Sequence, residues 1–130
     1  MSRAMIPSVE VFQGSDARLQ NRLVTTAQAV LDRDDITSWS ARVYDMSRGT
    51  LIKKLVDGSQ DVSSNFFATL QTGNGWSRDS TGYNFEYVVD GDAFKTEGGK
   101  QYRIEFNAVT ADENVKWAWV LKVQPWMGPT

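Results

Sequence analysis

The chain has 130 residues, of which 41% are hydrophobic and 23% are charged, a composition typical of one soluble globular domain. Lys and Arg total 14 against 16 Asp and Glu, and a net charge of -2 gives no electrostatic reason to expect binding to nucleic acid or anionic membranes. The sequence contains no Cys and no His, which excludes disulfides, thiolate or imidazole metal sites, and catalysis by a Cys nucleophile or a His base.

The N-terminal half is predicted to form short strands separated by turns. The expected order is a strand over 9–12, a partly alternating strand over 17–25, a polar turn region over 27–38, a strand over 39–46 and a strand over 50–56. The strand over 39–46 has the clearest alternation, with Trp39, Ala41 and Val43 on one face. The acidic stretch 31–35 is interpreted as a solvated turn rather than a calcium loop, because Val43 stands where an EF-hand needs its last carboxylate.

A long polar connection is expected over 57–81, where Gly, Ser, Asn and Asp are frequent. Within this connection, the apolar residues 66–70 are expected to form either a strand or a helix. Gly82 allows a tight turn into the next strand.

The C-terminal half alternates strongly in three segments, as half-buried strands require. The residues expected to point inward are Tyr83, Phe85, Tyr87 and Val89 in the first segment, Tyr102, Ile104, Phe106 and Ala108 in the second, and Val115, Trp117, Trp119, Leu121 and Val123 in the third. Asn84 and Glu86 are expected on the opposite, outward face. Together the segments predict an all-β protein, an antiparallel sandwich or barrel.

Two residues favour an immunoglobulin-like β-sandwich of about seven strands. Trp39 occupies the position of the core Trp on the third strand, and Tyr102 that of the Tyr that ties down a corner before the sixth. Ile104 stands where antibody domains carry their second cysteine, and its packing would replace the disulfide bond. Because the first half alternates weakly, jelly-roll and other sandwich topologies stay open.

The predicted organisation is an extended N-terminal arm over 1–7, one domain over 8–123 and a C-terminal tail over 124–130. The N-terminus lacks the apolar core of a secretory signal, and no run approaches the roughly 20 apolar residues that span a bilayer. We therefore expect no signal peptide and no membrane partner.

No catalytic, cofactor-binding or metal-binding residue is predicted. A glycosidase needs only a pair of carboxylates, and acidic residues are plentiful, but a small sandwich leaves little room for a deep cleft. We expect a protein that is not an enzyme and binds no cofactor.

The tryptophans provide the candidate contact residues. Trp117 and Trp119 share a face with aliphatic residues, which favours a place in the core. Trp76 and Trp126 lie outside the alternating strands and are candidate partner-binding residues, together with Met5 and Ile6 of the N-terminal arm. The alternative function is a carbohydrate-binding module for host-surface glycans, with Trp76, Trp117 or Trp119 exposed for stacking.

Three segments carry a resemblance to a known group: "EVFQGSDARLQ", "WSRDSTGYNF" and "GGKQYRIEFNAVTADENVKWAWVLKV". They resemble small immunoglobulin-like structural proteins of tailed bacteriophages, over most of the chain. The resemblance implies a virion component, made in the host cytoplasm, that decorates the capsid or forms part of the tail or neck. Its partners would be viral capsid or tail proteins, with many copies per particle and no nucleic acid bound.

Overall fold

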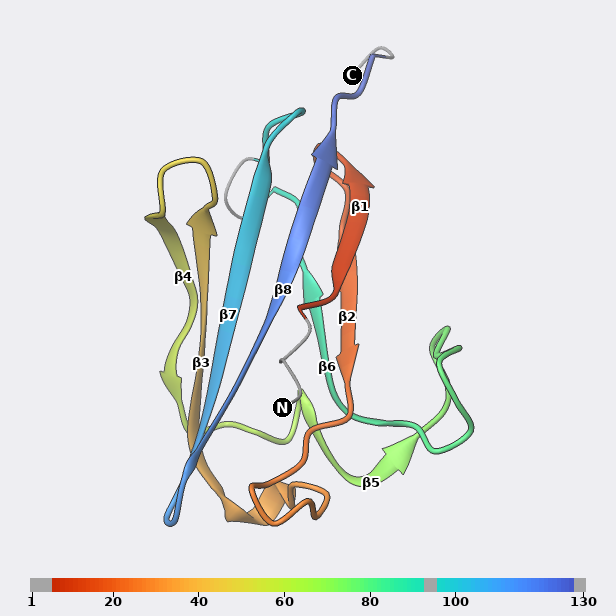
Figure 1. The fold of residues 1–130 in the computed structure, drawn as a ribbon, viewed down its shortest axis with the longest axis vertical. Helices are drawn as coiled ribbons and strands as arrows, with labels where there is room; N and C mark the ends of the chain where they lie inside the picture. The colour runs from red at the N-terminus through yellow and green to blue at the C-terminus, as the bar shows by residue number, and fades with distance from the viewer. Residues whose placement is uncertain (1–5, 93–95, 128–130) are drawn as a thin grey trace.

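A computed structural model describes residues 6–92 and 96–127 and has an all-β fold of two packed sheets. The strands are β1 (Ser8–Phe12), β2 (Ala17–Asn21), β3 (Ile36–Asp45), β4 (Thr50–Ser59), β5 (Phe66–Gln71), β6 (Tyr83–Val89), β7 (Gln101–Thr110) and β8 (Asn114–Gln124). The larger sheet has the order β1-β8-β7-β3-β4 and the smaller has the order β2-β6-β5 (Figure 1). Within the described ranges, no helix is long and apolar enough to cross a membrane.

The two-layer, all-β prediction is therefore confirmed, with two adjustments. The described residues form eight strands, and the ambiguous piece within the long connection is a strand, β5. The expectation of purely antiparallel pairing is wrong for β1, which runs parallel to β8 with Ser8 opposite Val120. Parallel neighbours need a long connection, and β1 and β8 come from opposite ends of the domain, so nearly the whole chain lies between them.

The acidic stretch before β3 has a local structural role. It forms a short 3-10 helix, η1 (Arg33–Asp35), and a carboxylate oxygen of Asp32 accepts a hydrogen bond from the Asp34 amide at 2.9 Å. This side chain caps the turn in the manner usual for Asp at a helix N-terminus.

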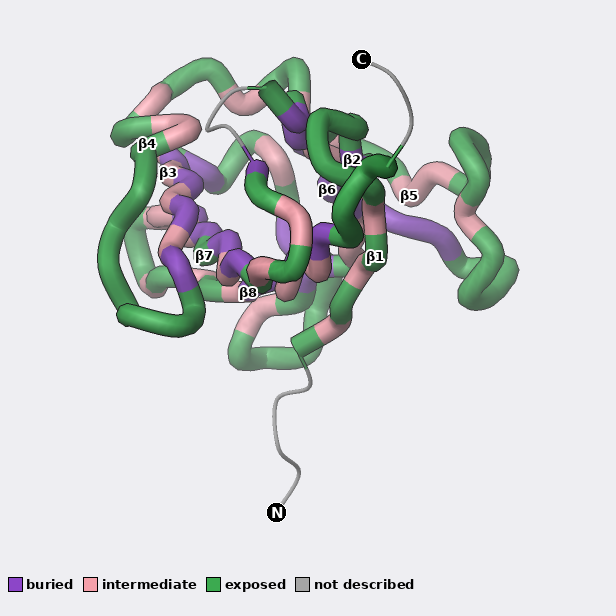
Figure 2. The backbone as a smooth tube through the Cα atoms, turned by 90° about the horizontal axis from the view of Figure 1, so that it is seen from above, coloured by how far each residue is buried: buried purple, intermediate pink, exposed green. Residues whose placement is uncertain are grey.

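The core lies between the sheets and is built mainly from the inward stripes that the alternation predicts (Figure 2). Its buried members are Ala17, Leu19, Leu23, Leu31, Ile36, Trp39, Ala41, Val43, Phe66, Phe85, Val89, Tyr102, Ile104, Phe106, Ala108, Trp119, Leu121 and Val123. Half-buried residues including Tyr87, Val115 and Trp117 pack against them. The predicted inward faces of β7 and β8 are thus confirmed.

Aromatic rings from the two sheets interlock at the centre. Trp39 of the larger sheet meets Phe66 and Phe85 of the smaller sheet edge to face, at centroid distances of 5.4 and 5.9 Å. Trp117 stacks on Phe106 at 5.4 Å and also contacts Phe85 at 4.9 Å. Edge-to-face and stacked pairs of this kind add to the stabilisation from burial, which explains why the two tryptophans face inward.

Asn84 corrects one part of the predicted alternation. It was expected on the outward face of β6, yet it is buried, with 3% of its surface exposed. Its side chain accepts a hydrogen bond from the Leu23 amide at 2.7 Å and donates to the carbonyls of Leu23 and Leu31, both at 3.2 Å. Residues 23–31 fold over this part of the smaller sheet, so the face that alternation assigns to solvent is covered.

Candidate interaction surfaces

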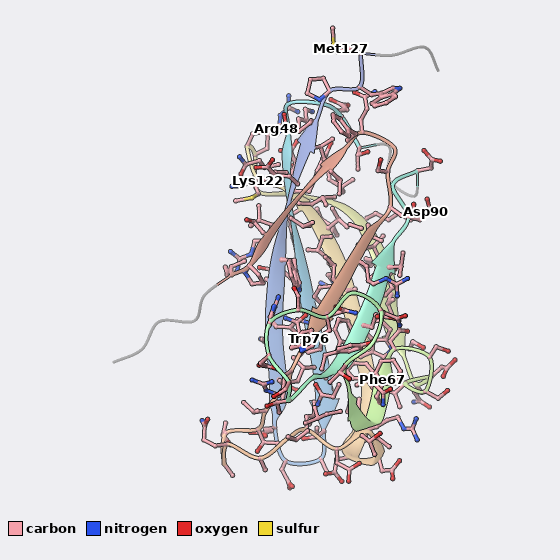
Figure 3. The ribbon with its side chains drawn as sticks, turned by 90° about the vertical axis from the view of Figure 1, so that its right-hand side faces the viewer. Arg48, Phe67, Trp76, Asp90, Lys122 and Met127 are labelled. Carbon is pink, nitrogen blue, oxygen red and sulfur yellow. The ribbon has the colours of Figure 1, made fainter. Side chains whose placement is uncertain are left out.

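An exposed group of apolar side chains lies at one end of the long axis of the sandwich. We call Phe12, Trp126 and Met127 the apical cluster; their exposed fractions are 52%, 51% and 90%. The rings of Phe12 and Trp126 meet edge to face at 5.3 Å. Figure 3 shows Met127 at the upper end of the molecule, beyond the end of β8. The cluster therefore presents aromatic surface to solvent rather than to the core.

The pairing of β1 with β8 creates this cluster. It places Phe12 opposite Gln124, and the chain continues the ladder with a hydrogen bond from the Gln13 amide to the Gln124 carbonyl at 2.9 Å. Trp126 follows two residues later and reaches back over Phe12. Residues 114 positions apart in the chain are thus brought side by side.

The loop between β6 and β7 fixes the start of the tail. A Cβ atom on Gly98 would overlap Pro125, so the loop backbone lies directly against the tail. The buried hydroxyl of Thr96 accepts a hydrogen bond from the Gly14 amide at 2.9 Å and donates to the Gly91 carbonyl at 3.2 Å. These contacts hold the β1–β2 turn, the loop and the tail together, which gives the apical cluster a defined geometry.

A groove runs across the outer face of the larger sheet, with a volume of about 650 Å³. The groove is lined by Ile6, Pro7, Asn21, Ser40, Arg42, Tyr44, Arg103, Glu105, Asn107, Lys116 and Ala118. Phe106 and Trp117 also border it, although their ring contacts lie between the sheets. We call this feature the outer groove.

Polar groups in the outer groove are only partly paired. Arg103 donates to the Glu105 carboxylate at 2.8 Å. Arg42 and Lys116 have no carboxylate partner among the described residues. Three residues that border the groove have a buried atom without a hydrogen-bond partner, namely the Nε of Arg42, the Oδ1 of Asn107 and the Nε1 of Trp117. An unsatisfied buried polar atom is costly, and the half-buried Arg42 and Asn107 side chains line the groove, so a ligand group that shifts these side chains and pairs their atoms would bind favourably.

The loop between β5 and β6 holds the predicted contact residue Trp76. The indole Nε1 of Trp76 donates to the carbonyl of Asp79 at 3.0 Å, and the ring packs on Tyr83 at 5.3 Å. The Arg78 guanidinium lies over both Trp76 and Trp119, at 5.2 and 5.3 Å from their ring centroids. Trp76 is therefore half-buried and engaged in contacts within the domain.

Asp79 organises the same loop. Its carboxylate accepts hydrogen bonds from the Gly82 amide at 3.0 Å and the Arg22 guanidinium at 2.8 Å. The bond from Gly82 and then that from Arg22 lower the pKa of Asp79 from 3.8 to about 2. Gly82 has a φ of 104°, and a Cβ there would collide with the backbone of Gln71, which explains the glycine before β6.

The candidate residues from the sequence are not brought into one site. Trp126 lies in the apical cluster, Ile6 borders the outer groove with 40% of its surface exposed, and Trp76 lies in the β5–β6 loop, well below Met127 in Figure 3. Met5 lies outside the described residues. Sequence reasoning missed Phe12, Arg42 and Asn107, since their roles depend on strand pairing that the local pattern does not encode.

Trp117 and Trp119 bear on the carbohydrate-binding alternative. Trp119 is buried, with its Nε1 donating to Asn21 at 2.8 Å, and Trp117 is packed among core rings. Neither forms the open, flat ring platform that sugar stacking requires. The prediction that Trp119 belongs to the core is confirmed, whereas Trp117 is half-buried and packs against the core.

Comparisons with protein-family models, with curated proteins and with solved structures found no significant match to this chain.

Proposed function

We propose that this protein is a non-enzymatic, immunoglobulin-like structural component of a bacteriophage virion. It binds neighbouring capsid or tail proteins through the apical cluster and so decorates or stabilises the particle. The virion setting rests on the resemblance of the three sequence segments to phage structural modules. The binding mode rests on the surface chemistry described above.

The strand order supports the immunoglobulin-like assignment. If β2, β3, β6, β7 and β8 are taken as strands B, C, E, F and G, then B and E share one sheet and C, F and G share the other, as in that fold. Trp39 is buried on the C strand, and the Tyr102 hydroxyl at the start of the F strand accepts a hydrogen bond from the Glu97 amide at 3.1 Å. One departure is the placement of β1, which pairs with β8 rather than with β2.

The apical cluster is the observation that carries the binding proposal. Trp is enriched at the centres of protein interfaces, where a large ring fills a pocket and loses water. Trp126 is half exposed and is held by an edge-to-face contact with Phe12, so little side-chain freedom remains to be lost on binding. Display of many copies on a particle lattice would convert a modest single-site affinity into firm attachment.

The test is quantitative mass spectrometry of purified phage particles whose genome encodes the chain. We expect many copies per particle, and at least about tenfold fewer when Trp126→Ser is encoded instead, because truncating an interface hot spot costs about 2 kcal/mol or more. Leu51→Ser is the matched control, since Leu51 is 44% exposed on the distant edge strand β4. Absence of the chain from wild-type particles, or full occupancy by Trp126→Ser, would refute the proposal.

A further inference from the structure

We propose that the outer groove is a second binding site, which takes an acidic, extended segment of a partner protein. This inference rests on the proposed function, in that it assumes protein partners, but it concerns a different surface from the apical cluster. The cluster is apolar and lies at one end of the sandwich. The groove carries charged and polar side chains and lies on the outer side of three strands.

The strand register defines the floor of the groove. Arg42 of β3 lies opposite Glu105 of β7, which lies opposite Ala118 of β8. In the next outward-facing row, Ser40 lies opposite Asn107, which lies opposite Lys116. Side chains directly opposite each other on one face are close neighbours, so these two rows form one continuous surface.

The chain before β1 forms a wall beside this floor. The Pro7 carbonyl accepts a hydrogen bond from the Val120 amide at 2.9 Å, which holds residues 6 and 7 against β8. Ala118 is the smallest side chain of its row and belongs to the lining of the groove. Ile6, on the same lining, adds an apolar rim.

The charge of the groove favours an anionic ligand. The Glu105 carboxylate is already paired with Arg103 at 2.8 Å, which leaves the positive charges of Arg42 and Lys116 uncompensated within the described part of the chain. The whole protein carries a net charge of -2, so this positive region does not follow from the overall composition. A partner with Asp or Glu side chains is complementary to it.

The unsatisfied atoms of Arg42 and Asn107 favour a peptide over a simple anion. Arg42 Nε is a donor and suits a carboxylate oxygen, whereas Asn107 Oδ1 is an acceptor and needs an N–H or O–H group. An acidic peptide supplies both, a carboxylate for Arg42 and a backbone amide for Asn107. Sulfate, which is fully ionised and can only accept hydrogen bonds, would leave Asn107 unsatisfied.

The experiment is an NMR titration of the isotope-labelled full chain with a capped hexamer of glutamate. We expect amide shifts concentrated at residues 40–44, 103–107 and 116–118. Arg42→Gln and Asn107→Ala should each weaken binding by about tenfold or more, because each leaves one partner of a charged or buried hydrogen bond unpaired. Arg48→Gln, an exposed arginine outside the groove, is the matched control and should change the affinity by less than about twofold.

The outcomes separate the possibilities. Absence of shifts, equal weakening by Arg48→Gln, or an unchanged affinity for Asn107→Ala would overturn the proposal, the last two because they indicate unspecific charge attraction. Binding of an oligogalacturonate hexamer in preference to the peptide would also overturn it, in favour of an acidic glycan. Thermal melts of each variant establish that it is folded.

The same titration with Trp126→Ser distinguishes this proposal from the proposed function. The hexamer has no apolar side chain, so its affinity should be unchanged when the apical cluster is altered. If Trp126→Ser attaches to particles as well as the wild type, the binding of the hexamer to the outer groove is still tested independently. If the hexamer does not bind the outer groove, the particle occupancy of Trp126→Ser still tests the apical cluster.

Discussion

The side chain of Asn84 connects β6 of the smaller sheet to segments that are far away in the chain. It bonds to the backbone at Leu23 and Leu31, which lie 61 and 53 residues away. Because Leu23 and Leu31 are buried, the Asn84 amide group replaces water as the partner of the Leu23 amide and the Leu31 carbonyl. The burial of this polar residue on the covered face of β6 thus has a structural cause.

Asn84→Ala tests this role through the free energy of unfolding. The Leu23 amide and the Leu31 carbonyl would each lose a buried partner at about 1–3 kcal/mol, so we expect destabilisation of about 3 kcal/mol in urea denaturation. Asn114→Ala, the same change at an exposed strand position, should stay within about 0.5 kcal/mol. Equal destabilisation by the two variants would show that the hydrogen bonds of Asn84 do not contribute to the free energy of unfolding.

Trp39 and Tyr102 illustrate where single-residue reasoning succeeded. Both were placed from their position in the chain, and both are buried in the core. The indole Nε1 of Trp39 also donates a hydrogen bond to the Asp61 carbonyl at 3.0 Å. The alternating pattern of the strand does not predict this contact. The inward direction is encoded locally, whereas the hydrogen-bond partner is not.

The loop between β5 and β6 behaves as a distinct element. The Asn74 carbonyl of this loop accepts from Gln20 of β2 at 3.1 Å, and Asp79 pairs at 2.8 Å with Arg22, which lies just after β2. Arg78 then reaches Trp119 of the larger sheet. The loop therefore closes one side of the sandwich, although its sequence resembles that of a solvated connection.

The ionisation of Asp79 gives this loop a defined pH dependence. Its pKa in the folded protein is about 2, below the ordinary value of 3.8, so the stabilisation is fully present above about pH 4 and is lost as the pH falls toward 2. We expect the NMR signal of the Trp76 indole N–H, which donates to Asp79, to stay constant down to about pH 4 and to shift below it.

Asp79→Asn provides the matching variant. It removes the charge that faces Arg22, so the Trp76 indole N–H should exchange faster with solvent at neutral pH and show no transition below pH 4. Asp112→Asn, in the exposed β7–β8 turn, should reproduce the wild-type titration. A wild-type transition that persists in Asp79→Asn would assign it to another carboxylate.

At the scale of the whole molecule, the two candidate surfaces depend on the pairing of the chain ends. β1 brings Phe12 beside Trp126 at one end of β8 and places Ile6 and Pro7 beside the outer groove at the middle of β8. The parallel ladder is thus the common support of both surfaces. If one partner binds the apical cluster and a second partner binds the outer groove, this single domain would link the two partners.

Gly98→Ala tests how this support is transmitted to the apical cluster. The added methyl group meets Pro125, so the tail must shift, and we expect loss of the nuclear Overhauser contact between the Phe12 and Trp126 rings. Overpacking of this kind costs about 1–3 kcal/mol. Gly73→Ala is the control, since a Cβ there meets nothing within 4 Å and its backbone does not have a positive φ. An unchanged ring contact in Gly98→Ala would contradict the proposed support.

The amino-acid sequence by itself determined the all-β class and the inward stripes of β7 and β8, because the two-residue period of a strand is a local property that each segment carries alone. The tertiary structure decided the parallel β1–β8 ladder, the burial of Asn84, the closed β5–β6 loop and the outer groove. Each of these depends on contacts between segments far apart in the chain, and the choice among such pairings is made by the packing of the whole domain.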